Sequence, residues 1–545
     1  MKSAWRDRLL LAGWASLLLA TTFLHPSLMA YDEGNFAAEA RFMAESGRWL
    51  SRLWWGEPVY THGVLLNWLM VVSFKVFGIG AQAARLPSAI ACLTAVLLTY
   101  DISRIITGRR VIGCLAAAML MLFHLWFQYG HLATQDMLLV CLELLGIWGL
   151  LKAEAKPNQR IAWGFMSGLV LGLGFLTKSF MILLPAAALV PYLVLQQRRH
   201  RHLTNPGLYL GLVTGVGLVG LWLWLSVAQY GDVVMASLFG KIGELGGKSF
   251  HADAGRFYYL WNIPVNAFPW PLFSMIGAWF CWRDDQQTAS KNPYRWLLIY
   301  PFVLAGLLTS FSTRTPYYTL QLHPFMALFG AIALHRIAHQ TVRWPRRLLS
   351  YSFAALGAIL MAIPIAALLY IGANFNSSTP ADSASSQAFG IAAEILPYAP
   401  IALTLGCGWL WLPVWMRQPR KWIATWLLSV WLGLGVAGLT GLFGDYSPGL
   451  MAALGRSPTA EIIATHPINF VTGTDWPDQE AQKTLILLSF YTPTLGQLNQ
   501  LFDELTPGSY AWLAPNADTD KLMTERPYER IAPVQQWELI HFLTP

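Results

Sequence analysis

The stretch YDEGNFAAEARF, residues 31–42, follows directly on the apolar run LLLAGWASLLLATTFLHPSLMA, residues 9–30. About 20 consecutive apolar residues are enough for a helix to cross a bilayer. The run has no small-residue cleavage site of the A-x-A type, so we expect a retained first span rather than a signal peptide. The adjacent carboxylates Asp32 and Glu33 are therefore predicted to lie where a membrane span meets water.

The composition extends this pattern to the whole chain. Of 545 residues, 55% are hydrophobic and 12% are charged, whereas a soluble protein carries about 25% charged residues. The 26 Trp and 20 Tyr residues suit the two membrane–water interfaces. We therefore predict a polytopic α-helical membrane protein. The net charge of +8 does not indicate nucleic-acid binding, because basic residues of membrane proteins gather on cytoplasmic loops.

The cysteines indicate neither a disulfide framework nor a metal site. All five lie in apolar runs and lack the spacing of metal ligands: Cys92, Cys114, Cys141, Cys281 and Cys407. We therefore expect no cofactor. The sequence does not exclude the use of a divalent metal ion.

Thirteen apolar runs are predicted to span the membrane: 9–30, 86–106, 111–128, 137–151, 161–176, 180–196, 207–229, 257–281, 296–312, 318–335, 348–372, 391–415 and 422–444. A further run, GVLLNWLMVVSFKVFG at residues 63–78, is at the short limit for a span. We predict that it lies at the outer interface, within a first outer loop (31–85) that carries interfacial helices.

The basic residues then predict the orientation. With 63–78 outside the bilayer, more than half of the 37 Lys and Arg residues fall on one side, in seven clusters: Lys2/Arg6/Arg8, Arg104/Arg109/Arg110, Lys152/Lys156/Arg160, Arg198/Arg199/Arg201, Arg283/Lys291/Arg295, Arg336/Arg343/Arg346/Arg347 and Arg417/Arg420/Lys421. Positive charge marks the cytoplasmic side. The N-terminus is therefore predicted in the cytoplasm and the C-terminus outside it.

The chain changes character after the last predicted span. The transmembrane part is predicted to occupy 1–444, with a Ser-rich linker at 374–387, and a small soluble α/β domain to occupy 445–545 on the outer face. Strands are predicted at 468–473, 484–490, 509–514 and 537–543, and helices at 494–505 and 517–525.

Several polar residues lie next to predicted span ends on the outer side: Asp32, Glu33, His62, Asp136, Lys178, His251, Arg256 and Arg314. Each could simply mark an interface, but polar groups at membrane depth are costly and usually functional. Asp32 and Asp136 could hold or deprotonate a hydroxyl. Lys178, Arg256 and Arg314 could bind a phosphate, which at this surface would belong to a lipid. No Walker loop or dinucleotide fingerprint is present, so no ATP is implied.

A series of motifs follows Asp32-Glu33 in order: ARLPSA (84–89), GRR (108–110), HLATQD (131–136), GLGFLTKSF (172–180), FYYLW (257–261) and FSTRTPYYTLQLHP (311–324). Their order and sidedness resemble the polyprenyl-phosphate-dependent glycosyltransferases of the GT-C fold. The bacterial group with the lipid A 4-amino-4-deoxy-L-arabinose transferase and the protein O-mannosyltransferases is the most similar. The resemblance covers about 1–340 by motif and the rest by architecture.

The sequence departs from this family at three places. Asn35 stands where the family often has Arg after Asp-Glu, and Gln135 stands at the Pro of Thr-Pro-Asp. The Lys-Pro-Pro or His-Pro-Pro segment is THG here, so that His62 keeps the basic position and both prolines are missing. These positions bear on the sugar and the acceptor more than on the reaction type.

The resemblance implies a GT-C fold and an inverting transfer of a sugar from a polyprenyl (undecaprenyl or dolichyl) phosphate. Asp32 would be the general base, with Asp136 the second catalytic carboxylate and Glu33 in support. The donor and acceptor would be bound by Glu33, His62, Lys178, His251, Arg256, Arg314, Tyr317 and Tyr318.

The expected location is the inner (plasma) membrane, and the expected acceptor is a lipid A-type glycolipid. Three alternatives remain at this point: a protein O-mannosyltransferase-like enzyme acting on Ser or Thr of exported proteins, a transporter or flippase of lipid-linked sugars, and a non-catalytic membrane-assembly protein.

Overall fold

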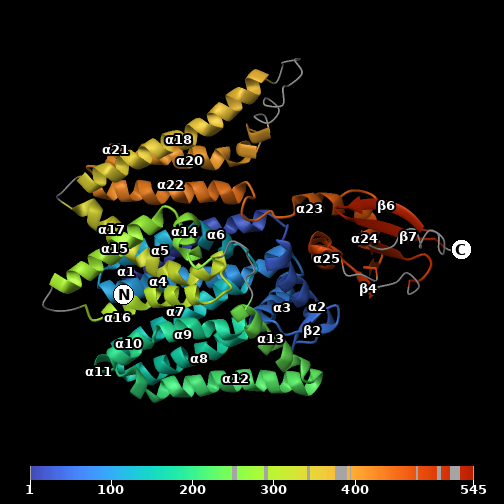
Figure 1. Ribbon diagram of the computed structural model, residues 1–545, viewed down its shortest axis with the longest axis horizontal. Helices are drawn as coiled ribbons and strands as arrows, with labels where there is room; N and C mark the ends of the chain where they lie inside the picture. Colours follow the sequence, from blue (N-terminus) through green and yellow to red (C-terminus); the bar gives the residue numbers. More distant parts are fainter. Residues whose placement is uncertain are drawn as a thin grey trace.

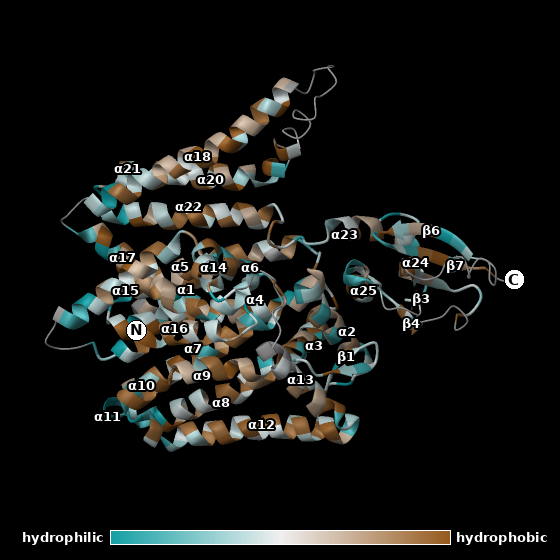
Figure 2. Cartoon of the chain, in the orientation of Figure 1, coloured by the Kyte–Doolittle hydropathy of each residue, from teal (hydrophilic) through white to brown (hydrophobic). Residues whose placement is uncertain are grey.

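The computed structural model shows a bundle of helices with a smaller lobe at one end, formed by the C-terminal part of the chain (Figure 1). Brown, hydrophobic residues cover the long outer helices of the bundle, such as α12 and α22 (Figure 2). The structure describes residues 2–247, 255–287, 292–340, 344–374, 390–392, 394–473, 477–499, 505–515 and 528–543.

The first part of the chain contains the first outer loop and the core helices of the bundle. Its elements are α1 (Lys2–Leu19), η1 (Ala20–Leu24), η2 (Ala30–Gly34), α2 (Asn35–Ser46), β1 (Arg52–Trp54), β2 (Glu57–Val59), α3 (Leu65–Phe77), α4 (Ala81–Thr107), α5 (Arg110–Leu120), α6 (His124–Gly130) and α7 (Gln135–Ala155). η2 is a single turn of π-helix, whereas the other η elements are 3₁₀-helices.

The middle of the chain contains only helices and connecting turns among its described residues. Its elements are η3 (Pro157–Gln159), α8 (Arg160–Lys178), η4 (Ser179–Ile182), α9 (Leu183–Ala188), α10 (Val190–Leu195), α11 (Gln197–His200), η5 (His202–Thr204), α12 (Pro206–Tyr230), α13 (Val233–Gly247), α14 (Tyr258–Asn266), α15 (Trp270–Gln287), α16 (Arg295–Ser310), η6 (Pro316–Leu322), α17 (His323–His339), α18 (Trp344–Asn374), η7 (Leu396–Tyr398), α20 (Ala399–Leu410), α21 (Leu412–Trp415) and α22 (Pro419–Leu439).

The polytopic membrane architecture is confirmed. Among the described residues, six helical segments are long and apolar enough to cross a membrane. The number is seven if α5 and α6, which are bent by 69° and cover the predicted span 111–128, count as one span. The remaining predicted spans also coincide with helices, but these are shorter or carry more charge. Thirteen spans thus stays a prediction with which the helices are consistent.

The run 63–78 forms α3, a helix of 13 residues. At about 1.5 Å per residue, such a helix is too short to cross a hydrocarbon core of about 30 Å. It packs instead against α2 and α4, and Lys75 lies over the ring of Trp49, with Nζ 4.6 Å from the centroid. This geometry is what an interfacial helix requires.

Helices α8 and α12 approach each other through glycines. A Cβ added at Gly172 would lie 2.4 Å from backbone atoms of Gly215, and one added at Gly211 would lie 1.9 Å from the carbonyl oxygen of Phe165. Small residues spaced by four allow such backbone contact between membrane helices. The contact fixes the course of α8, whose last residue is Lys178.

The C-terminal lobe is built on a five-stranded sheet of order β4-β3-β5-β7-β6. β3 is parallel to β4 and β5, and β7 is antiparallel to β5 and β6. Its elements are α23 (Pro448–Leu454), α24 (Thr459–Thr465), β3 (Ile468–Val471), α25 (Gln479–Tyr491), β4 (Leu495–Asn499), β5 (Tyr510–Leu513), β6 (Tyr528–Val534) and β7 (Trp537–Phe542).

The strands predicted at 468–473, 509–514 and 537–543 are confirmed, and two other predictions for this lobe are wrong. The apolar run 484–490 lies within helix α25, whose first turn Asp478 caps by accepting from Ala481 N at 2.8 Å. The whole run is buried, because α25 lies between the sheet, where Trp537 Nε1 donates to the carbonyl oxygen of Ala481, and the segments η2 and α2. Part of 494–505 forms strand β4, where pairing with β3 overrides helix propensity. The helix predicted at 517–525 and most of the linker 374–387 lie outside the described residues.

Candidate functional site

Glu33, in the π-helical turn η2, is fully buried and all of its hydrogen-bonding capacity is used. Its Oε1 accepts from Arg85 Nε at 2.8 Å and from the backbone N of Ala133 at 2.9 Å. Its Oε2 accepts from Arg85 Nη2 at 2.8 Å and from the backbone N of Met29 at 2.9 Å. Neither side chain of the pair is exposed. Glu33 therefore joins the first outer loop, α4 and the segment that precedes α7.

Arg85 completes this joint by donating to two carbonyls of the chain that leads into η2, those of His25 at 2.9 Å and Ser27 at 2.8 Å. A buried guanidinium that is bonded to a carboxylate and to carbonyls holds all of these groups at fixed positions. The neighbouring residue Asp32 is thereby placed on a rigid turn.

Asp32 is partly exposed and points to a different region from Glu33. It lines a cavity, and its charge acts on tyrosines that are distant in sequence. Burial raises the pKa of Tyr317 above its usual value, and Tyr318, Asp136 and Asp32 add to this rise. Asp32 and Asp136 thus influence the same phenol.

Asp136 and Lys178 form a buried ion pair, with Lys178 Nζ 2.6 Å from Asp136 Oδ1. Asp136 lies in the first turn of α7 and Lys178 is the last residue of α8, so each charge complements the dipole of its own helix. Lys178 Nζ also lies 4.7 Å from the ring centroid of Tyr317 and 5.2 Å from that of Tyr318. One ammonium group is therefore held by a carboxylate and two aromatic rings.

Further aromatic and basic residues pack around the Asp136–Lys178 pair and Tyr317. The rings of Tyr129 and Tyr317 lie 5.6 Å apart, and the hydroxyl of Tyr259 donates to the carbonyl oxygen of Thr315 at 3.3 Å. Arg314 is half-buried, and its Nε and Nη2 donate to the carbonyl oxygen of Thr309 at 3.2 and 2.9 Å. The segment 314–318 is thus held against α14, α16 and the Asp136–Lys178 pair.

The remaining predicted residues are placed less centrally. His62 contacts Thr61, with Nδ1 3.1 Å from Oγ1, and its ring lies 6.2 Å from that of Phe36. The next residue, Gly63, packs directly on the end of α8, where an added Cβ would lie 2.0 Å from the carbonyl oxygen of Leu176. Arg256 is exposed in the turn that precedes α14. His251 lies outside the described residues.

Some residues of this site were not singled out from the sequence. Arg85 lies in the motif ARLPSA. A buried arginine requires a carboxylate partner, and this requirement could have paired Arg85 with Glu33. Tyr446 carries no such signal. It lines the same cavity as Asp32, and its hydroxyl accepts from Gln128 Nε2 at 3.3 Å.

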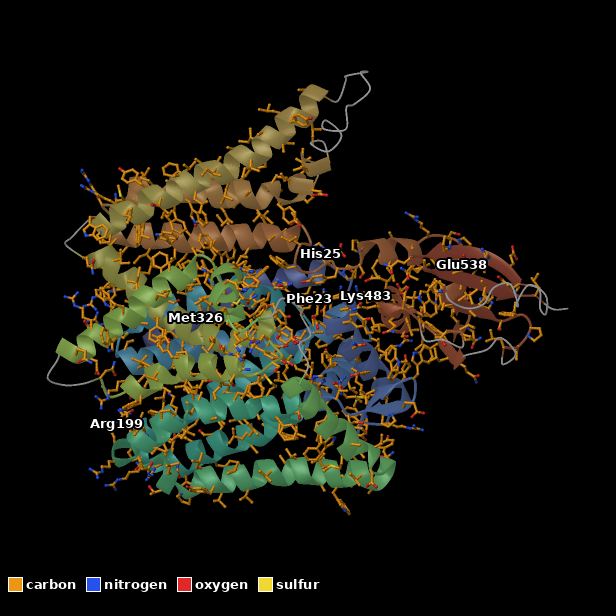
Figure 3. The ribbon with its side chains drawn as sticks, in the orientation of Figure 1. Phe23, His25, Arg199, Met326, Lys483 and Glu538 are labelled. Atoms are coloured by element: carbon orange, nitrogen blue, oxygen red, sulfur yellow. The ribbon has the colours of Figure 1, made fainter. Side chains whose placement is uncertain are left out.

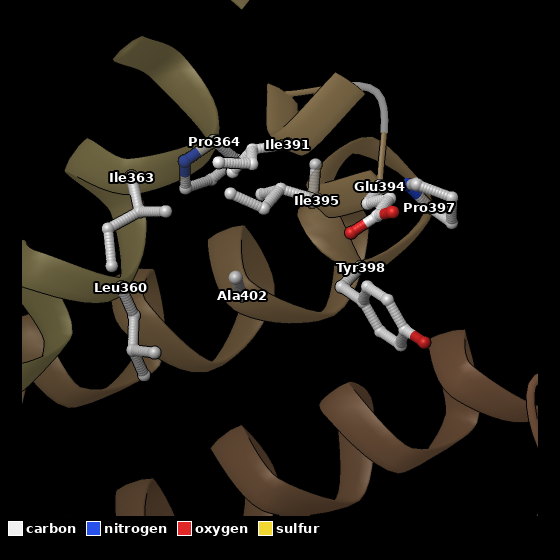
Figure 4. Close-up of a pocket in the computed structure, with 10 residues that line it drawn as sticks. Leu360, Ile363, Pro364, Ile391, Glu394, Ile395, Pro397, Tyr398 and Ala402 are labelled. Atoms are coloured by element: carbon white, nitrogen blue, oxygen red, sulfur yellow. The ribbon is translucent and has the colours of Figure 1, made fainter. Parts of the chain in front are cut away.

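Two cavities of similar volume differ in character. One of about 550 Å³ lies between η2 and the C-terminal lobe and includes Asp32. Another of about 590 Å³ lies between α18 and the segment 391–402, and it is lined mostly by apolar side chains such as Ile363 and Ile391 around Glu394 (Figure 4). The second contains none of the predicted site residues. Among the described residues, no group of three or more His, Cys, Asp and Glu is arranged to hold a metal ion.

The cluster lies at the end of the bundle that carries the C-terminal lobe. In Figure 3, Lys483 of the lobe and His25, between η1 and η2, lie at this junction, whereas Arg199, of a predicted cytoplasmic cluster, lies at the opposite end of the bundle. The predicted inner and outer sides are therefore opposite ends of the molecule.

Comparison with solved structures confirms the fold. ArnT from Cupriavidus metallidurans bound to undecaprenyl phosphate aligns with a TM-score of 0.75 at 18% identity, over 98% of this chain and 97% of that chain. The apo form of the same protein aligns with a TM-score of 0.70 at 19% identity, over 97% of this chain and 98% of that chain. The chain therefore has the GT-C fold that its motifs predict.

Sequence comparison points in the same direction over part of the chain. Residues 61–224 match the family model described as dolichyl-phosphate-mannose-protein mannosyltransferase. Undecaprenyl phosphate-alpha-4-amino-4-deoxy-L-arabinose arabinosyl transferase 2 of Pseudomonas fluorescens is 27% identical over 61% of this chain and 57% of its own length. The transferase of this kind from Pseudomonas aeruginosa is 27% identical over 49% of both chains. The match spans less than two thirds of either relative.

Proposed function

We propose that the chain is an inverting glycosyltransferase that moves a sugar from a polyprenyl phosphate to an acceptor on the outer face of the membrane, such as a lipid A-type glycolipid. The shared fold with a protein solved with undecaprenyl phosphate supports a polyprenyl-phosphate donor. The names of the relatives support a glycosyl transfer from that carrier.

The observation that carries this proposal is the buried Asp136–Lys178 pair, whose ammonium lies over the rings of Tyr317 and Tyr318. Asp136 of α7 and Asp32 of η2 both contribute to the raised pKa of Tyr317, after burial and Tyr318. A carboxylate near a buried ammonium is what a displacement at a sugar phosphate requires: one group to accept a proton, and another to offset charge on the leaving phosphate.

In the proposed reaction, an oxygen of the acceptor attacks the anomeric carbon while the bond from that carbon to the phosphate oxygen breaks. The lipid phosphate leaves with the bonding electrons, and the proton of the acceptor hydroxyl passes to Asp32. Lys178 and Arg314, with Tyr317 and Tyr318, stabilise the departing phosphate. Glu33 acts through Arg85 by holding Asp32 in position.

Asp136 sets the position of Lys178, and exchange of this carboxylate for the donor phosphate would make the ammonium available to the lipid. His62, Arg256 and His251 are proposed to contact donor or acceptor around this centre. The chain is proposed to lie in the inner membrane, with the N-terminus in the cytoplasm and the C-terminus outside it. Arg199, of one predicted basic cluster, supports this orientation because it lies at the end of the bundle opposite to the lobe (Figure 3).

The match of 61–224 to a protein mannosyltransferase model favours one second candidate, transfer to Ser or Thr of exported proteins. A transporter is expected to bind its substrate near the middle of the bundle, whereas the Asp136–Lys178 pair lies at helix ends. These alternatives differ in the product they form.

The test is transfer of a radiolabelled sugar from an undecaprenyl-phosphate sugar by the purified full chain in detergent. Lipid A and a Ser/Thr-rich peptide serve as separate acceptors. Labelled lipid A supports the proposal, and labelled peptide supports the second candidate. If neither is labelled and reconstituted vesicles instead accumulate the lipid-linked sugar in the opposite leaflet, the chain is a transporter.

A further inference from the structure

The cavity of about 550 Å³ beside Asp32 has one wall from the transmembrane part and another from the C-terminal lobe. Its lining residues are Met29, Ala30, Tyr31, Asp32, Tyr446, Ser447, Glu480, Lys483, Thr484, Leu487, Gln535 and Gln536. Its volume lies within the range of about 300–1,000 Å³ that is usual for ligand sites. A carboxylate proposed to act as the base thus opens onto a chamber that the lobe completes.

The lobe contributes a continuous surface to this chamber. Its residues on α25 occupy positions 480, 483, 484 and 487, which is the spacing of one helix face. The two-residue turn between β6 and β7 supplies Gln535 and Gln536. Thr484 donates to Gln535 Oε1 at 2.6 Å, and this bond ties the turn to the helix.

The wall is held rigidly against η2. Arg41 of α2 is buried and donates to four carbonyl oxygens at the end of α25, those of Ser489, Phe490, Thr492 and Pro493, at 2.6 to 3.1 Å. The hydroxyl of Tyr31 donates to the carbonyl oxygen of Gln479 at 3.0 Å at the beginning of the same helix. Both ends of α25 are therefore fastened to the first outer loop, and the chamber is preformed.

The chemistry of the lining favours one class of ligand. Asp32 and Glu480 supply carboxylates, and Gln536 supplies an amide; such planar groups bind neighbouring hydroxyls through paired hydrogen bonds. Tyr31 and Tyr446 supply aromatic rings, on which the C–H face of a sugar ring packs. Lys483 is bonded to Glu480, so the positive charge in the lining has a carboxylate beside it. This combination suits a polyhydroxylated ring better than an acyl chain.

We propose that this cavity is the acceptor site, that α25 and the β6–β7 turn form its outer wall, and that it binds the carbohydrate of the acceptor. The role of the cavity as an acceptor site rests on the proposed transferase function. Its binding of carbohydrate does not depend on that function. The C-terminal lobe then presents the sugar of the acceptor to Asp32, while the donor occupies the side of Lys178.

Binding is tested without catalysis by protection of a cysteine. Gln536→Cys, in the exposed turn, is labelled with an impermeant maleimide in the full chain, with Glu529→Cys on exposed β6 as the matched control and the parent chain as background. The probes are lipid A, its fully deacylated disaccharide and a Ser/Thr-rich peptide. We expect both lipid A and the disaccharide to slow labelling of Gln536→Cys by about tenfold at saturation, and neither to protect Glu529→Cys.

Each other pattern overturns the inference. Protection by lipid A alone means that acyl chains are bound, protection by the peptide alone means a protein acceptor, and no protection means that the cavity is not a ligand site. A chain that is protected by the disaccharide but transfers no sugar disproves the transferase and leaves the carbohydrate site standing.

Kinetics test the assignment to the acceptor rather than the donor. Gln536→Trp fills the chamber from an exposed turn, whereas Glu529→Trp adds the same bulk to the same lobe outside it. For Gln536→Trp we expect the KM for the acceptor to rise about tenfold, which corresponds to about 1.4 kcal/mol, with an unchanged KM for the donor. Equal changes in both constants, or an unchanged KM for the acceptor, contradict the assignment.

Discussion

Two buried ion pairs lie close together at the end of the bundle that carries the C-terminal lobe, and they differ in how completely they are bonded. In the Arg85–Glu33 pair, both carboxylate oxygens accept twice and the guanidinium also binds two carbonyls. In the Lys178–Asp136 pair, the bond joins Nζ to one carboxylate oxygen, and the ammonium also faces the rings of Tyr317 and Tyr318.

The difference separates framework from function. A pair whose every bond is made inside the protein resists any rearrangement, since each lost bond leaves a buried charge uncompensated. A pair with one bond and an aromatic cage can exchange a carboxylate oxygen for a phosphate oxygen. We therefore expect changes at the first pair to alter stability, and changes at the second pair and at Asp32 to alter binding and rate.

The largest effect is expected at Asp32, which the Arg85–Glu33 pair holds in position. Asp32→Asn keeps the size of the side chain and removes the base, so the transfer rate should fall by about 10²–10⁴-fold. Donor binding should stay nearly intact. The measurement is transfer from an undecaprenyl-phosphate sugar in detergent, beside donor binding, with Asp232→Asn, an exposed position just beyond α12, as the matched control.

A parental rate in Asp32→Asn would show that Asp32 is not the base. An acceptor that is itself a phosphate, ionised without help, would produce this result, and Asp32 would then orient the acceptor only. In that case, the pH dependence of transfer should follow the phosphate rather than a carboxylate.

The second effect is on stability. Glu33→Gln leaves Arg85 buried beside a neutral amide, and breaking a buried pair in this way costs about 3–5 kcal/mol. Glu45→Gln removes one partner of Arg41, a carboxylate that is 40% exposed, and should cost less than about 1 kcal/mol because the carbonyl partners of Arg41 remain. Thermal unfolding followed by tryptophan fluorescence measures both. Equal midpoints for the two variants would contradict the framework role of the Arg85–Glu33 pair.

The same contrast explains what could be predicted from the sequence. The membrane architecture, the short helix α3 and the positions of Asp136 and Lys178 at helix ends follow from apolar runs and motifs, which are local properties. The direct bond between Asp136 and Lys178 was not predicted. The pairing of Glu33 with Arg85 and the arrival of Tyr446 beside Asp32 depend on contacts across 52 and about 400 residues, for which the sequence has no periodic signal.

In the C-terminal lobe, a predicted strand is a helix and part of a predicted helix is a strand. The run 484–490 has the apolar density of a buried strand, but it forms helix α25, and the helix-like segment at 495–499 forms an edge strand. Short apolar runs of this kind fit either state, and sheet pairing decides between them. The division of the chain at 444/445 and the number of thirteen spans stay predictions.

The third effect is on donor affinity and tests whether the Lys178–Asp136 pair exchanges its carboxylate for the donor phosphate. Lys178→Ala removes a charge-assisted bond to the donor phosphate, which should weaken donor binding by about 1.5–3 kcal/mol. Arg314→Ala should act in the same direction, whereas Lys75→Ala, a lysine of α3 that lies over Trp49, should leave the affinity unchanged. Binding of undecaprenyl phosphate in detergent measures all three. Unchanged affinity in Lys178→Ala would move the phosphate site away from the pair.

The smallest effect is expected at Gly63, where the first outer loop rests on the end of α8. A Cβ at this position would lie 2.0 Å from the carbonyl oxygen of Leu176, a backbone atom, so Gly63→Ala must move the loop or the helix. Such overpacking costs about 1–3 kcal/mol. Because Lys178 lies two residues beyond Leu176, a moved helix end also displaces the ammonium, and donor affinity should fall a few-fold while the fold persists.

Gly217→Ala on α12, where an added Cβ meets nothing within 4 Å, is the matched control and should leave both properties unchanged. Loss of stability without any change in donor affinity would show that the loop contact supports the fold alone, and that Lys178 is positioned by its bond to Asp136 rather than by the end of α8.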